Sequence, residues 1–279
     1  MKAEMSRSVC AVALSKAEFQ WIAQFLYEHT GIALNDSKTA LVMGRLDKRL
    51  RLHRHRSYSE YIGLLTSSAG LDEQKVAINL LTTNETYFFR EPKHFDFLKE
   101  RALPYFLSQS KVRAWSAASS SGEEAYSVAM LLAESRGMRD WEVLGSDISS
   151  YVLEKAKLGL YPLAAADKIP KPLLKKYCLK GCEEYENNLL IEPTLKSRVK
   201  FEAINLVQVL PDIGIFDLIF LRNVMIYFNR DTKQKLVRNV MQHLRPGGYF
   251  FISHSESLNG LGLSLPQVAP SIYQKPSEQ

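Results

Sequence analysis

The first part of the chain has hydrophobic residues spaced as in amphipathic helices. Between residues 15 and 82 they recur at the period of one helix face. Two tetrapeptides, Ser15-Lys-Ala-Glu18 and Ser57-Tyr-Ser-Glu60, have the form of a capping box that begins a helix. We therefore predict an all-helical domain of about four helices over residues 1–82, without strands. Two sets of apolar residues share a helix face each: Phe19, Ile22, Phe25 and Leu26, and then Leu41, Val42, Leu46 and Leu50.

From residue 111 onward, short apolar runs alternate with helical segments. Strands alternating with helices form a mostly parallel sheet covered on both faces, so residues 111–279 are predicted to be an α/β domain. The runs typical of strands are residues 112–117, 141–147, 216–222 and 247–253. The segments with helical periodicity are residues 123–136, 149–158 and 231–244.

One segment, residues 177–205, interrupts this alternation. It contains short strand-like runs at 189–191 and 199–203. Three residues before the first run favour turns, namely Gly181, Asn187 and Asn188. The pattern indicates a small antiparallel β-subdomain inserted into the α/β domain at about residues 177–200.

A linker at residues 83–110 joins the two parts, and it begins in the aromatic stretch LTTNETYFFREP (81–92). Tyr87, Phe88 and Phe89 stand there among polar residues. Two interpretations are open. The stretch is either an aromatic plug between two helices or a lid over a ligand pocket, where its rings exclude water or face a cation.

Ligands of open parallel sheets bind at the carboxyl ends of the strands, and four polar places lie there. The first is the turn 117–124, which holds three serines and one glycine instead of the several glycines of a nucleotide-binding turn. Glu123 and Glu124 at the following helix start would repel a phosphate and attract a cation. Glu124 also fits a second interpretation, as capping-box partner of Ser121.

The other three places follow later strands. Asp147 ends a strand where an acid can accept the hydroxyl groups of a ribose. Asn205 and Leu206 follow the inserted segment, and Arg222-Asn223-Val224 with Tyr227 follow a buried strand. Together the four places describe a nucleoside ligand with a cationic group and no phosphates. S-adenosylmethionine fits this description, with its methionine end at the serine-rich turn.

Composition and charge indicate the kind of partner and the cellular compartment. The chain carries a net charge of +6 with a pI near 9.1, which favours acidic partners. It shows no secretory signal and no membrane span, and the three cysteines, Cys10, Cys178 and Cys182, suggest neither a disulfide framework nor a metal site. We expect a cytoplasmic protein that needs no metal.

The positive charge is concentrated between residues 38 and 56. A solvated helix face and an anion-binding surface explain this segment equally well. Its basic residues are Lys38, Arg45, Lys48, Arg49, Arg51, Arg54 and Arg56, with Asp47 as the only acid.

Five stretches now carry a specific resemblance. TTNETYFFRE, WSAASSSGEEAYSVAM, GSDISSYVLEKA, FLRNVMIYF and LRPGGYFFISHSES together resemble the chemotaxis receptor methyltransferases, the CheR family, from about residue 15 to about residue 273. The resemblance implies a helical N-terminal domain followed by a Rossmann-like methyltransferase domain with an inserted antiparallel β-subdomain. It further implies methyl transfer from S-adenosylmethionine to glutamates on chemoreceptor cytoplasmic helices, with γ-methyl esters and S-adenosylhomocysteine as products.

The resemblance also implies roles for individual residues. Arg90 and Tyr227 match residues that act next to the transferred methyl group. The basic segment 38–56 matches the surface that docks on the receptor, and the chain is expected to be monomeric and to reach the membrane only through receptors. The residues that match cofactor contacts are Asn84, Thr86, Arg90, Glu124, Asp147, Asn205, Leu206, Asn223 and Val224.

The inserted loop GCEEYENN (181–188) departs from the family pattern. Some relatives grip a receptor's C-terminal pentapeptide with a loop that contains two glycines, whereas this loop has only Gly181, with Asn187 and Asn188 in place of the second. Asparagine tolerates a left-handed backbone, so the turn can survive. Binding of a pentapeptide through the β-subdomain stays open.

Two other functions compete with receptor methylation. A nucleic-acid methyltransferase would share the fold and the basic charge, but the chain has neither an Asn/Asp-Pro-Pro-Tyr/Phe motif nor a cysteine that follows a proline. An adaptor that binds S-adenosylmethionine without turnover would have lost site residues, whereas Arg90, Asp147 and Tyr227 are all present. Both are less favoured than the receptor enzyme, and no nucleic-acid partner is expected.

Overall fold

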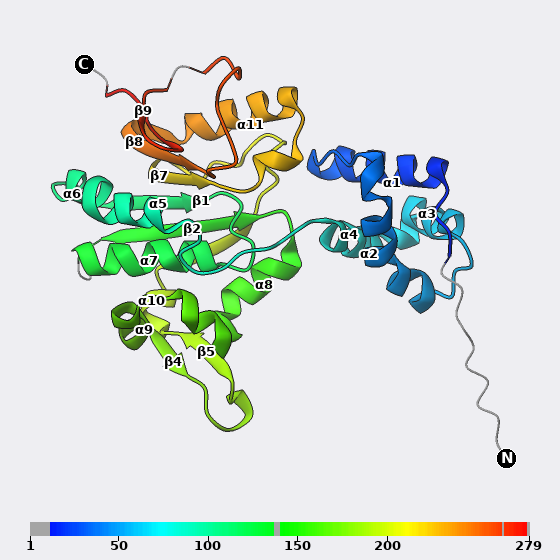
Figure 1. The fold of residues 1–279 in the computed structure, drawn as a ribbon, viewed down its shortest axis with the longest axis horizontal. Coiled ribbons are helices and arrows are strands. Elements are labelled where there is room, and N and C mark those ends of the chain that lie inside the picture. Colours follow the sequence, from blue (N-terminus) through cyan, green and yellow to red (C-terminus); the bar gives the residue numbers. More distant parts are fainter. Residues whose placement is uncertain (1–11, 137–139, 264, 278–279) are drawn as a thin grey trace. The chain divides into compact units, whose positions relative to one another are not determined.

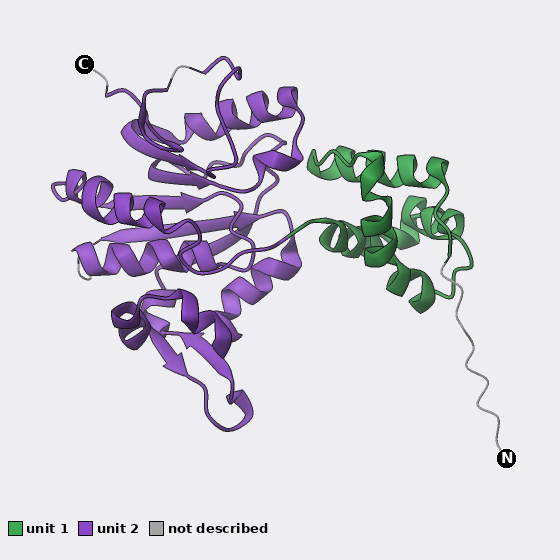
Figure 2. Ribbon diagram, in the orientation of Figure 1, with its two compact units in different colours: residues 1–83 green, residues 84–279 purple. Residues whose placement is uncertain are grey.

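The computed structural model describes residues 12–136, 140–263 and 265–277. The chain forms two compact units, residues 1–83 and residues 84–279, which are coloured separately in Figure 2. Cys10 lies outside the described residues. Of the predicted linker 83–110, residue 83 belongs to the smaller unit and residues 84–110 to the larger one.

The smaller unit is a bundle of helices, as the periodicity predicted. Ser15 makes the full capping box, since its hydroxyl accepts from Glu18 N–H while Glu18 accepts from Ser15 N–H. Ser57 accepts from Glu60 N–H, but the Glu60 carboxylate bonds to Arg56 N–H, so this second box is only half formed. The helices are α1 (Lys16–Thr30), α2 (Thr39–Leu52), α3 (Tyr58–Thr66) and α4 (Leu71–Leu81), with short 3-10 turns at Asp36–Lys38 and Ser68–Gly70.

A buried carboxylate ties three helices of this unit together. Glu73 of α4, 6% exposed, binds Arg49 of α2 and accepts hydrogen bonds from Tyr61 (2.6 Å) and His53 (2.9 Å). These bonds and the charge of Arg49 outweigh the burial and lower the pKa of Glu73 to about 2. Around it, apolar residues of all four helices form one core: Phe19, Ile22, Phe25, Leu26, Val42, Leu46, Leu50, Tyr58, Tyr61, Leu65, Ala77 and Leu81.

The larger unit is built on a seven-stranded sheet in the order β6-β2-β1-β7-β8-β10-β9 (Figure 1). Neighbouring strands from β6 to β8 are parallel, and β10 and β9 are antiparallel. The chain runs outward from β1 to β6 and then returns to the other side of β1, which places the topological switch point between β1 and β7. The strands are β1 (Val112–Ser116), β2 (Trp141–Asp147), β6 (Val199–Ala203), β7 (Phe216–Leu221), β8 (Leu244–Ile252), β9 (Gln267–Ala269) and β10 (Ile272–Gln274).

Helices cover both faces of this sheet. On β1, Ala114 packs in the cluster that contains the buried side of α7 (Glu123–Arg136), whereas Trp115 points the other way and meets His243 at the end of α11 (Arg230–Gln242). Helix α8 (Ser150–Leu158) packs beside β2 and β6. This arrangement, with the helical bundle before it, confirms the predicted Rossmann-like α/β class.

The β-subdomain consists of other strands than those predicted. Its sheet has the order β3-β5-β4 and is antiparallel, but Val199–Ala203 is not part of it. That strand, β6, is the edge of the main sheet and pairs parallel with β2. The prediction was wrong because an edge strand with one exposed face alternates like a hairpin strand. The subdomain strands are β3 (Leu160–Pro162), β4 (Cys178–Lys180) and β5 (Asn188–Ile191), preceded or joined by a 3-10 turn Leu163–Lys168 and by α9 (Lys171–Tyr177).

Shorter elements complete the subdomain. They are the 3-10 turn Glu183–Tyr185 in the loop before β5 and α10 (Pro193–Lys196) after it. In that loop Asn187 has φ 67°, the left-handed conformation that the sequence allowed, while Asn188 is extended within β5.

The aromatic stretch before the sheet is mostly core. Phe88 and Phe89 are 1% and 9% exposed, and they pack against Tyr161 and Phe95. These two rings therefore support the plug interpretation, while Tyr87 remains exposed. The segment continues as α5 (Pro92–Phe97), a π-helical turn Leu98–Ala102 and α6 (Leu103–Tyr105).

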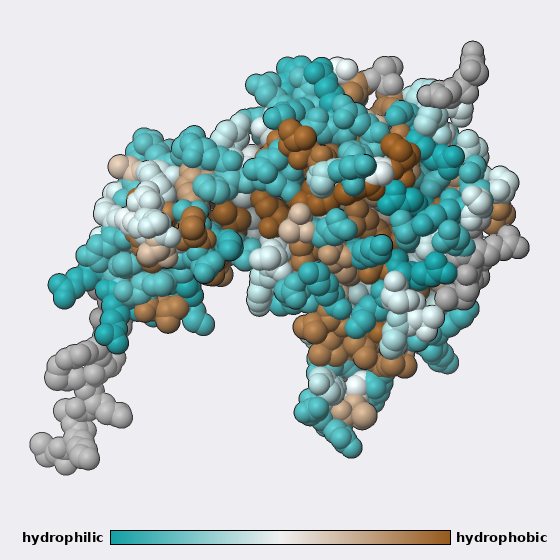
Figure 3. Space-filling model, turned by 180° about the vertical axis from the view of Figure 1, so that it is seen from behind, coloured by the Kyte–Doolittle hydropathy of each residue, from teal (hydrophilic) through white to brown (hydrophobic). Residues whose placement is uncertain are grey.

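The surface of the two units differs on the face that Figure 3 shows. The smaller unit is mostly hydrophilic there, whereas hydrophobic residues gather in the middle of the larger unit. Within the described ranges, no helix is both long enough and apolar enough to cross a bilayer.

The Glu73 carboxylate makes the stability of the smaller unit dependent on pH. Its folded pKa of about 2 lies below the usual 4.5, so its stabilisation is complete above pH 4.5 and is lost as the pH falls toward 2. We expect Glu73→Gln to lower the free energy of unfolding by about 2–3 kcal/mol at pH 7, and by little near pH 2. Hydrogen exchange of α2 and α4 amides at several pH values measures this. Glu28→Gln, at an exposed site on α1, is the control, and an equal loss at both pH values would contradict the account.

Candidate active site

The turn after β1 is shaped by backbone contacts. Gly122 has φ 95°, and a Cβ there would lie 2.8 Å from the Ala156 side chain, so only glycine fits. Ser119 N–H donates to Ser146 O, and Ser120 N–H donates to the Asp147 carboxylate. The Ser119 hydroxyl is buried and has no hydrogen-bond partner among the described residues. An unpaired hydroxyl in such a turn fits a ligand contact.

Asp147 joins the turn to the next strands. Its carboxylate accepts from Ser120 N–H and Ser149 N–H, both at 2.9 Å, while burial raises its pKa. Its carbonyl accepts from Ile204 N–H at 3.1 Å, which brings the following Asn205 and Leu206 to the same place. The predicted ribose acceptor and these two residues therefore lie together at the carboxyl ends of β2 and β6.

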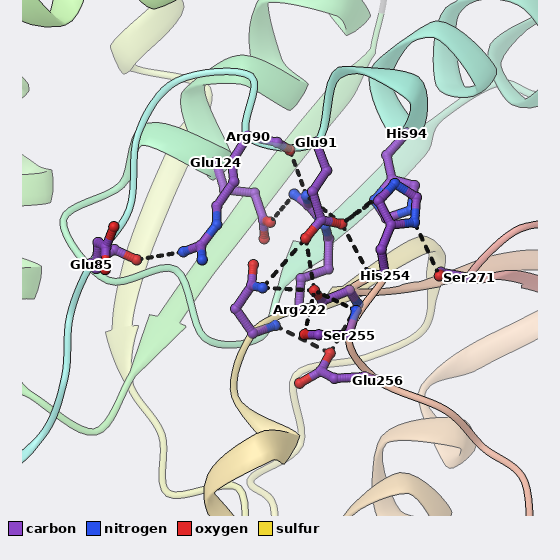
Figure 4. A network of polar contacts seen from close by, with 12 residues as sticks. Glu85, Arg90, Glu91, His94, Glu124, Arg222, His254, Ser255, Glu256 and Ser271 are labelled. Carbon is purple, nitrogen blue, oxygen red and sulfur yellow. Dashed lines mark hydrogen bonds and ion pairs between the residues drawn. The ribbon is translucent and has the colours of Figure 1, made fainter.

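A buried guanidinium lies at the next strand end. The Arg222 side chain, 1% exposed, donates to Glu124 Oε2 at 2.7 Å and lies 3.3 Å from Glu91 Oε2 (Figure 4). It also donates to the carbonyl of Arg90. The other Glu124 oxygen accepts from the Ser116 hydroxyl. The interpretation of Glu124 as capping partner of Ser121 was wrong, because Glu123 takes that hydroxyl.

The loop after β7 is held by a second carboxylate that the sequence did not single out. Glu256 accepts hydrogen bonds from the N–H groups of Ser253, Asn223 and Met225. Burial raises its pKa. Asn223 has φ 58° there, and its side-chain amide donates to the Ser253 hydroxyl at 2.7 Å. These bonds order the loop that leads to Tyr227 at the end of a 3-10 turn, Met225–Tyr227.

Glu91 completes the network, and two histidines lie beside it. Hydrogen bonds from Ser253 and the charge of Arg222 overcome burial and lower the pKa of Glu91 to about 2. Burial, and then the charge of Arg222, lower the pKa of His94 to about 3, so its imidazole is neutral. Ligand atoms of Glu91, His94 and His254 lie within 4.8 Å of one another. A divalent cation bound by these three residues would be repelled by the positive charge of Arg222, which already pairs with Glu91 Oε2.

The remaining predicted site residues lie on two segments joined by these contacts. The Asn84 carbonyl accepts from the Ser120 hydroxyl at 2.9 Å, and Thr86 and Val224 are half-buried. Arg90 donates to the Glu85 carbonyl at 2.7 Å, and its guanidinium lies 5.6 Å from the Tyr87 ring. Since Arg222 and Asn223 both contact Arg90 or Glu91, the segments 84–91 and 222–227 lie side by side.

The basic residues of the smaller unit are not equivalent. Arg45 donates to the carbonyls of Leu81 and Thr82, and Arg49 binds Glu73, so both have partners within this unit. The side chain of Arg51 pairs with Asp47 but is 59% exposed. The other basic residues of the segment that are exposed are Lys38, Lys48, Arg54 and Arg56.

The charges of the site suit a cationic ligand. The buried guanidinium of Arg222 faces two partly buried carboxylates, Glu124 and Glu91, so the three groups carry a net charge of −1 that an ammonium ion would neutralise. Asp147 offers oxygens for sugar hydroxyls, and the serine-rich turn offers an unpaired hydroxyl. The residues present therefore fit the methionine and ribose groups of S-adenosylmethionine.

Fold and site together define a Rossmann-like methyltransferase, and comparison with known proteins agrees. Residues 84–271 match the family model described as CheR methyltransferase, SAM binding domain, and residues 17–82 match CheR methyltransferase, all-alpha domain. The chain is 39% identical over 262 residues to chemotaxis protein methyltransferase 2 of Pseudomonas aeruginosa, covering 93% of each protein. It is also 39% identical over 253 residues to the chemotaxis protein methyltransferase of Salmonella typhimurium, covering 90% of this chain and 87% of that protein.

The chain belongs to the CheR methyltransferase family. Its cofactor is S-adenosylmethionine, and its activity is methyl transfer in chemotaxis. Sequence reasoning missed Glu91, Glu256 and His94. Glu91 and Glu256 belong to stretches that carried the resemblance, TTNETYFFRE and LRPGGYFFISHSES, and His94 lies three residues after the first of them. Their position in or near these stretches was the only indication in the sequence that these residues belong to the site.

Asp147 is predicted to decide cofactor affinity. Asp147→Asn keeps the size of the side chain but replaces one acceptor oxygen by an amide that cannot accept, so S-adenosylmethionine should bind about 10–100-fold more weakly by calorimetry. Glu142→Gln, on the same strand β2 but near its amino end, is the matched control and should leave the affinity unchanged. Equal affinity of Asp147→Asn and the wild type would remove Asp147 from the ribose site.

Proposed function

We propose that the chain transfers the methyl group of S-adenosylmethionine to glutamate side chains of chemoreceptor cytoplasmic domains, forming glutamate methyl esters in sensory adaptation. The observation that carries the proposal is the position of Arg90. Its carbonyl is held by Arg222, which also binds Glu124, while its own guanidinium extends away from that cluster toward Glu85 (Figure 4). A half-buried cation next to the cofactor site suits a carboxylate substrate.

The residues have separate tasks in this reaction. Bound S-adenosylmethionine supplies a methyl group activated by its sulfonium. The C–O bond to the glutamate oxygen forms as the C–S bond breaks, and the electron pair remains on sulfur, giving the ester and S-adenosylhomocysteine. Arg90 holds the incoming carboxylate by charge-assisted hydrogen bonds, and the Tyr227 hydroxyl positions it. A glutamate is already ionised at pH 7, so no side chain has to act as general base.

The proposal includes the partner and the compartment. The substrate is a bundle of receptor helices with acidic residues. The enzyme acts as a monomer and contacts this bundle through the exposed basic residues of segment 38–56. The enzyme acts in the cytoplasm, where those receptor domains lie, and it touches the membrane only through receptors. The loop 181–188, with Asn187 left-handed, offers a second contact for a receptor's C-terminal pentapeptide.

Label transfer tests the proposal. Chemoreceptor-containing membranes and nucleic acid are incubated in parallel with the enzyme and methyl-labelled S-adenosylmethionine, and products are treated with base. Label on receptor that base releases as methanol is the expected result, because esters hydrolyse and methylated amines do not. Label on nucleic acid, or cofactor binding without any transfer to matched receptors, would contradict it.

Arg90 and Tyr227 should affect turnover differently. Arg90→Ala removes the charge that orients the carboxylate, and kcat on receptor should fall about 100-fold. Tyr227→Phe removes one hydroxyl, so kcat should fall about tenfold while the cofactor Kd stays unchanged. Steady-state methylation and calorimetry give both numbers. Near-normal turnover of Arg90→Ala would refute its assigned role.

The exposed basic residues should affect receptor affinity alone. Reversing Lys48 and Arg54 to glutamate removes attraction to an acidic receptor surface, so KM for receptor should rise several-fold at low salt and less at high salt. The cofactor Kd should not change. Lys16→Glu on α1, outside the basic segment, is the control. An equal rise of KM for the control and the double variant would contradict docking through segment 38–56.

A further inference from the structure

Arg222 contacts two residues with predicted site roles, Glu124 and Arg90, and it also contacts Glu91. It follows β7 directly, at the switch point of the sheet, and its side chain is only 1% exposed. Its two terminal nitrogens reach three groups from two distant segments: the carboxylates of Glu124 and Glu91 and the carbonyl of Arg90. A guanidinium can do this because its donors lie in a fixed plane, whereas an ammonium group cannot hold the same three acceptors in that geometry.

The contacts link the two halves of the reaction. Glu124 is a predicted cofactor contact at a helix start that attracts a cation, which suits the ammonium group of the cofactor, and Arg90 is proposed to hold the incoming carboxylate. Nη1 of Arg222 fixes the first, and Nη2 fixes the backbone of the second. A buried charge without partners is very unfavourable, so Arg222 is held in place by both contacts.

We propose that Arg222 is a positioning residue that aligns the cofactor-binding Glu124 with the substrate-binding Arg90. It acts through these two residues, by the hydrogen bonds that it donates to the Glu124 carboxylate and to the Arg90 carbonyl. The inference rests on the proposed roles of Glu124 and Arg90, and it assigns to Arg222 the relative position of the two reactants.

The two surrounding carboxylates have distinct tasks in this arrangement. Glu124 has an oxygen bound to Arg222 and another bound to Ser116, and lone pairs on both remain for an ammonium group. Glu91 keeps the group at a net charge of −1 and is itself held by the hydroxyl of Ser253 at 2.7 Å. Neutralising Glu91 should therefore weaken the attraction for the cofactor from a distance.

Arg222→Lys is the decisive variant because it keeps the positive charge but removes the planar set of guanidinium donors. We expect the Kd of S-adenosylmethionine to rise about tenfold and kcat on receptor to fall by a further factor of about ten, in protein whose unfolding is cooperative. Arg113→Lys is the matched control. Arg113 near the amino end of β1 also holds a carboxylate, Glu142, and two backbone carbonyls, and should change neither number.

A double-mutant cycle separates positioning from a general loss of structure. If Arg222 acts on the cofactor through Glu124, then Arg222→Lys combined with Glu124→Gln binds S-adenosylmethionine no more weakly than Glu124→Gln alone. The inference would be overturned if the two substitutions weakened cofactor binding additively, or if Arg222→Lys left both Kd and kcat unchanged. Neither result would affect the proposed methylation of receptors. An unchanged Kd in Glu124→Gln would remove Glu124 from the cofactor site and overturn both this inference and that assignment.

Glu91→Gln covers the case in which Arg222→Lys fails to fold. Glu91 is outside the predicted cofactor contacts, so the loss of its charge alone would raise the cofactor Kd and leave kcat at saturating cofactor unchanged. A kcat on receptor lowered several-fold under those conditions, with the kcat of Arg113→Lys unaltered, supports the inference. A kcat equal to the wild-type value contradicts it.

Discussion

The pairing of one buried guanidinium with two carboxylates determines how the larger unit builds its site. Arg222, Glu124 and Glu91 come from three segments far apart in the sequence, and the cost of leaving any one of these charges unpaired keeps the segments together. Segment 84–91 has no regular secondary structure of its own. Its attachment to the sheet depends on these polar contacts and on the burial of Phe88 and Phe89 beneath it.

The sheet topology explains why this pairing occurs where the cofactor binds. Strand β1 lies between β2 and β7; the connection after β1 leads to β2 and the connection after β7 leads to β8, so the two connections leave the carboxyl ends of these neighbouring strands in opposite directions. The turn 117–122, Asp147 and Arg222 therefore converge at one edge. Neither a phosphate-binding glycine loop nor an excess of positive charge is present there. The net negative charge suits the ammonium group of S-adenosylmethionine, and Arg90 next to it suits a negatively charged acceptor.

Much of the fold could be predicted where the hydrophobic periodicity extended over many residues or where the strand was fully buried. Helix Glu123–Arg136 and strand Trp141–Asp147 have the predicted bounds. Strand β3, three residues long, is too short to show alternation, and β6 was assigned to the wrong sheet because its exposed edge mimics a hairpin. Pairing partners are a tertiary property, which local periodicity does not contain.

The candidate site could be predicted by residue but not by contact. Asp147 was found because it ends a strand and Asn205 because it follows the inserted segment, yet the sequence could not show that Glu124 binds Arg222 instead of Ser121. Glu256 and Glu91 were missed because their importance lies in the N–H and hydroxyl groups that converge on them from other segments. The same holds for the basic segment, in which Arg45 and Arg49 point to partners that only the folded helices bring near.

A crystal structure with bound S-adenosylhomocysteine tests the central claim most directly. The account predicts the ammonium group within hydrogen-bond distance of Glu124, whose contact with Arg222 is retained, and the ribose hydroxyls on Asp147. A methionine group bound away from Glu124, or a complex in which Arg222 has left both carboxylates, would contradict it.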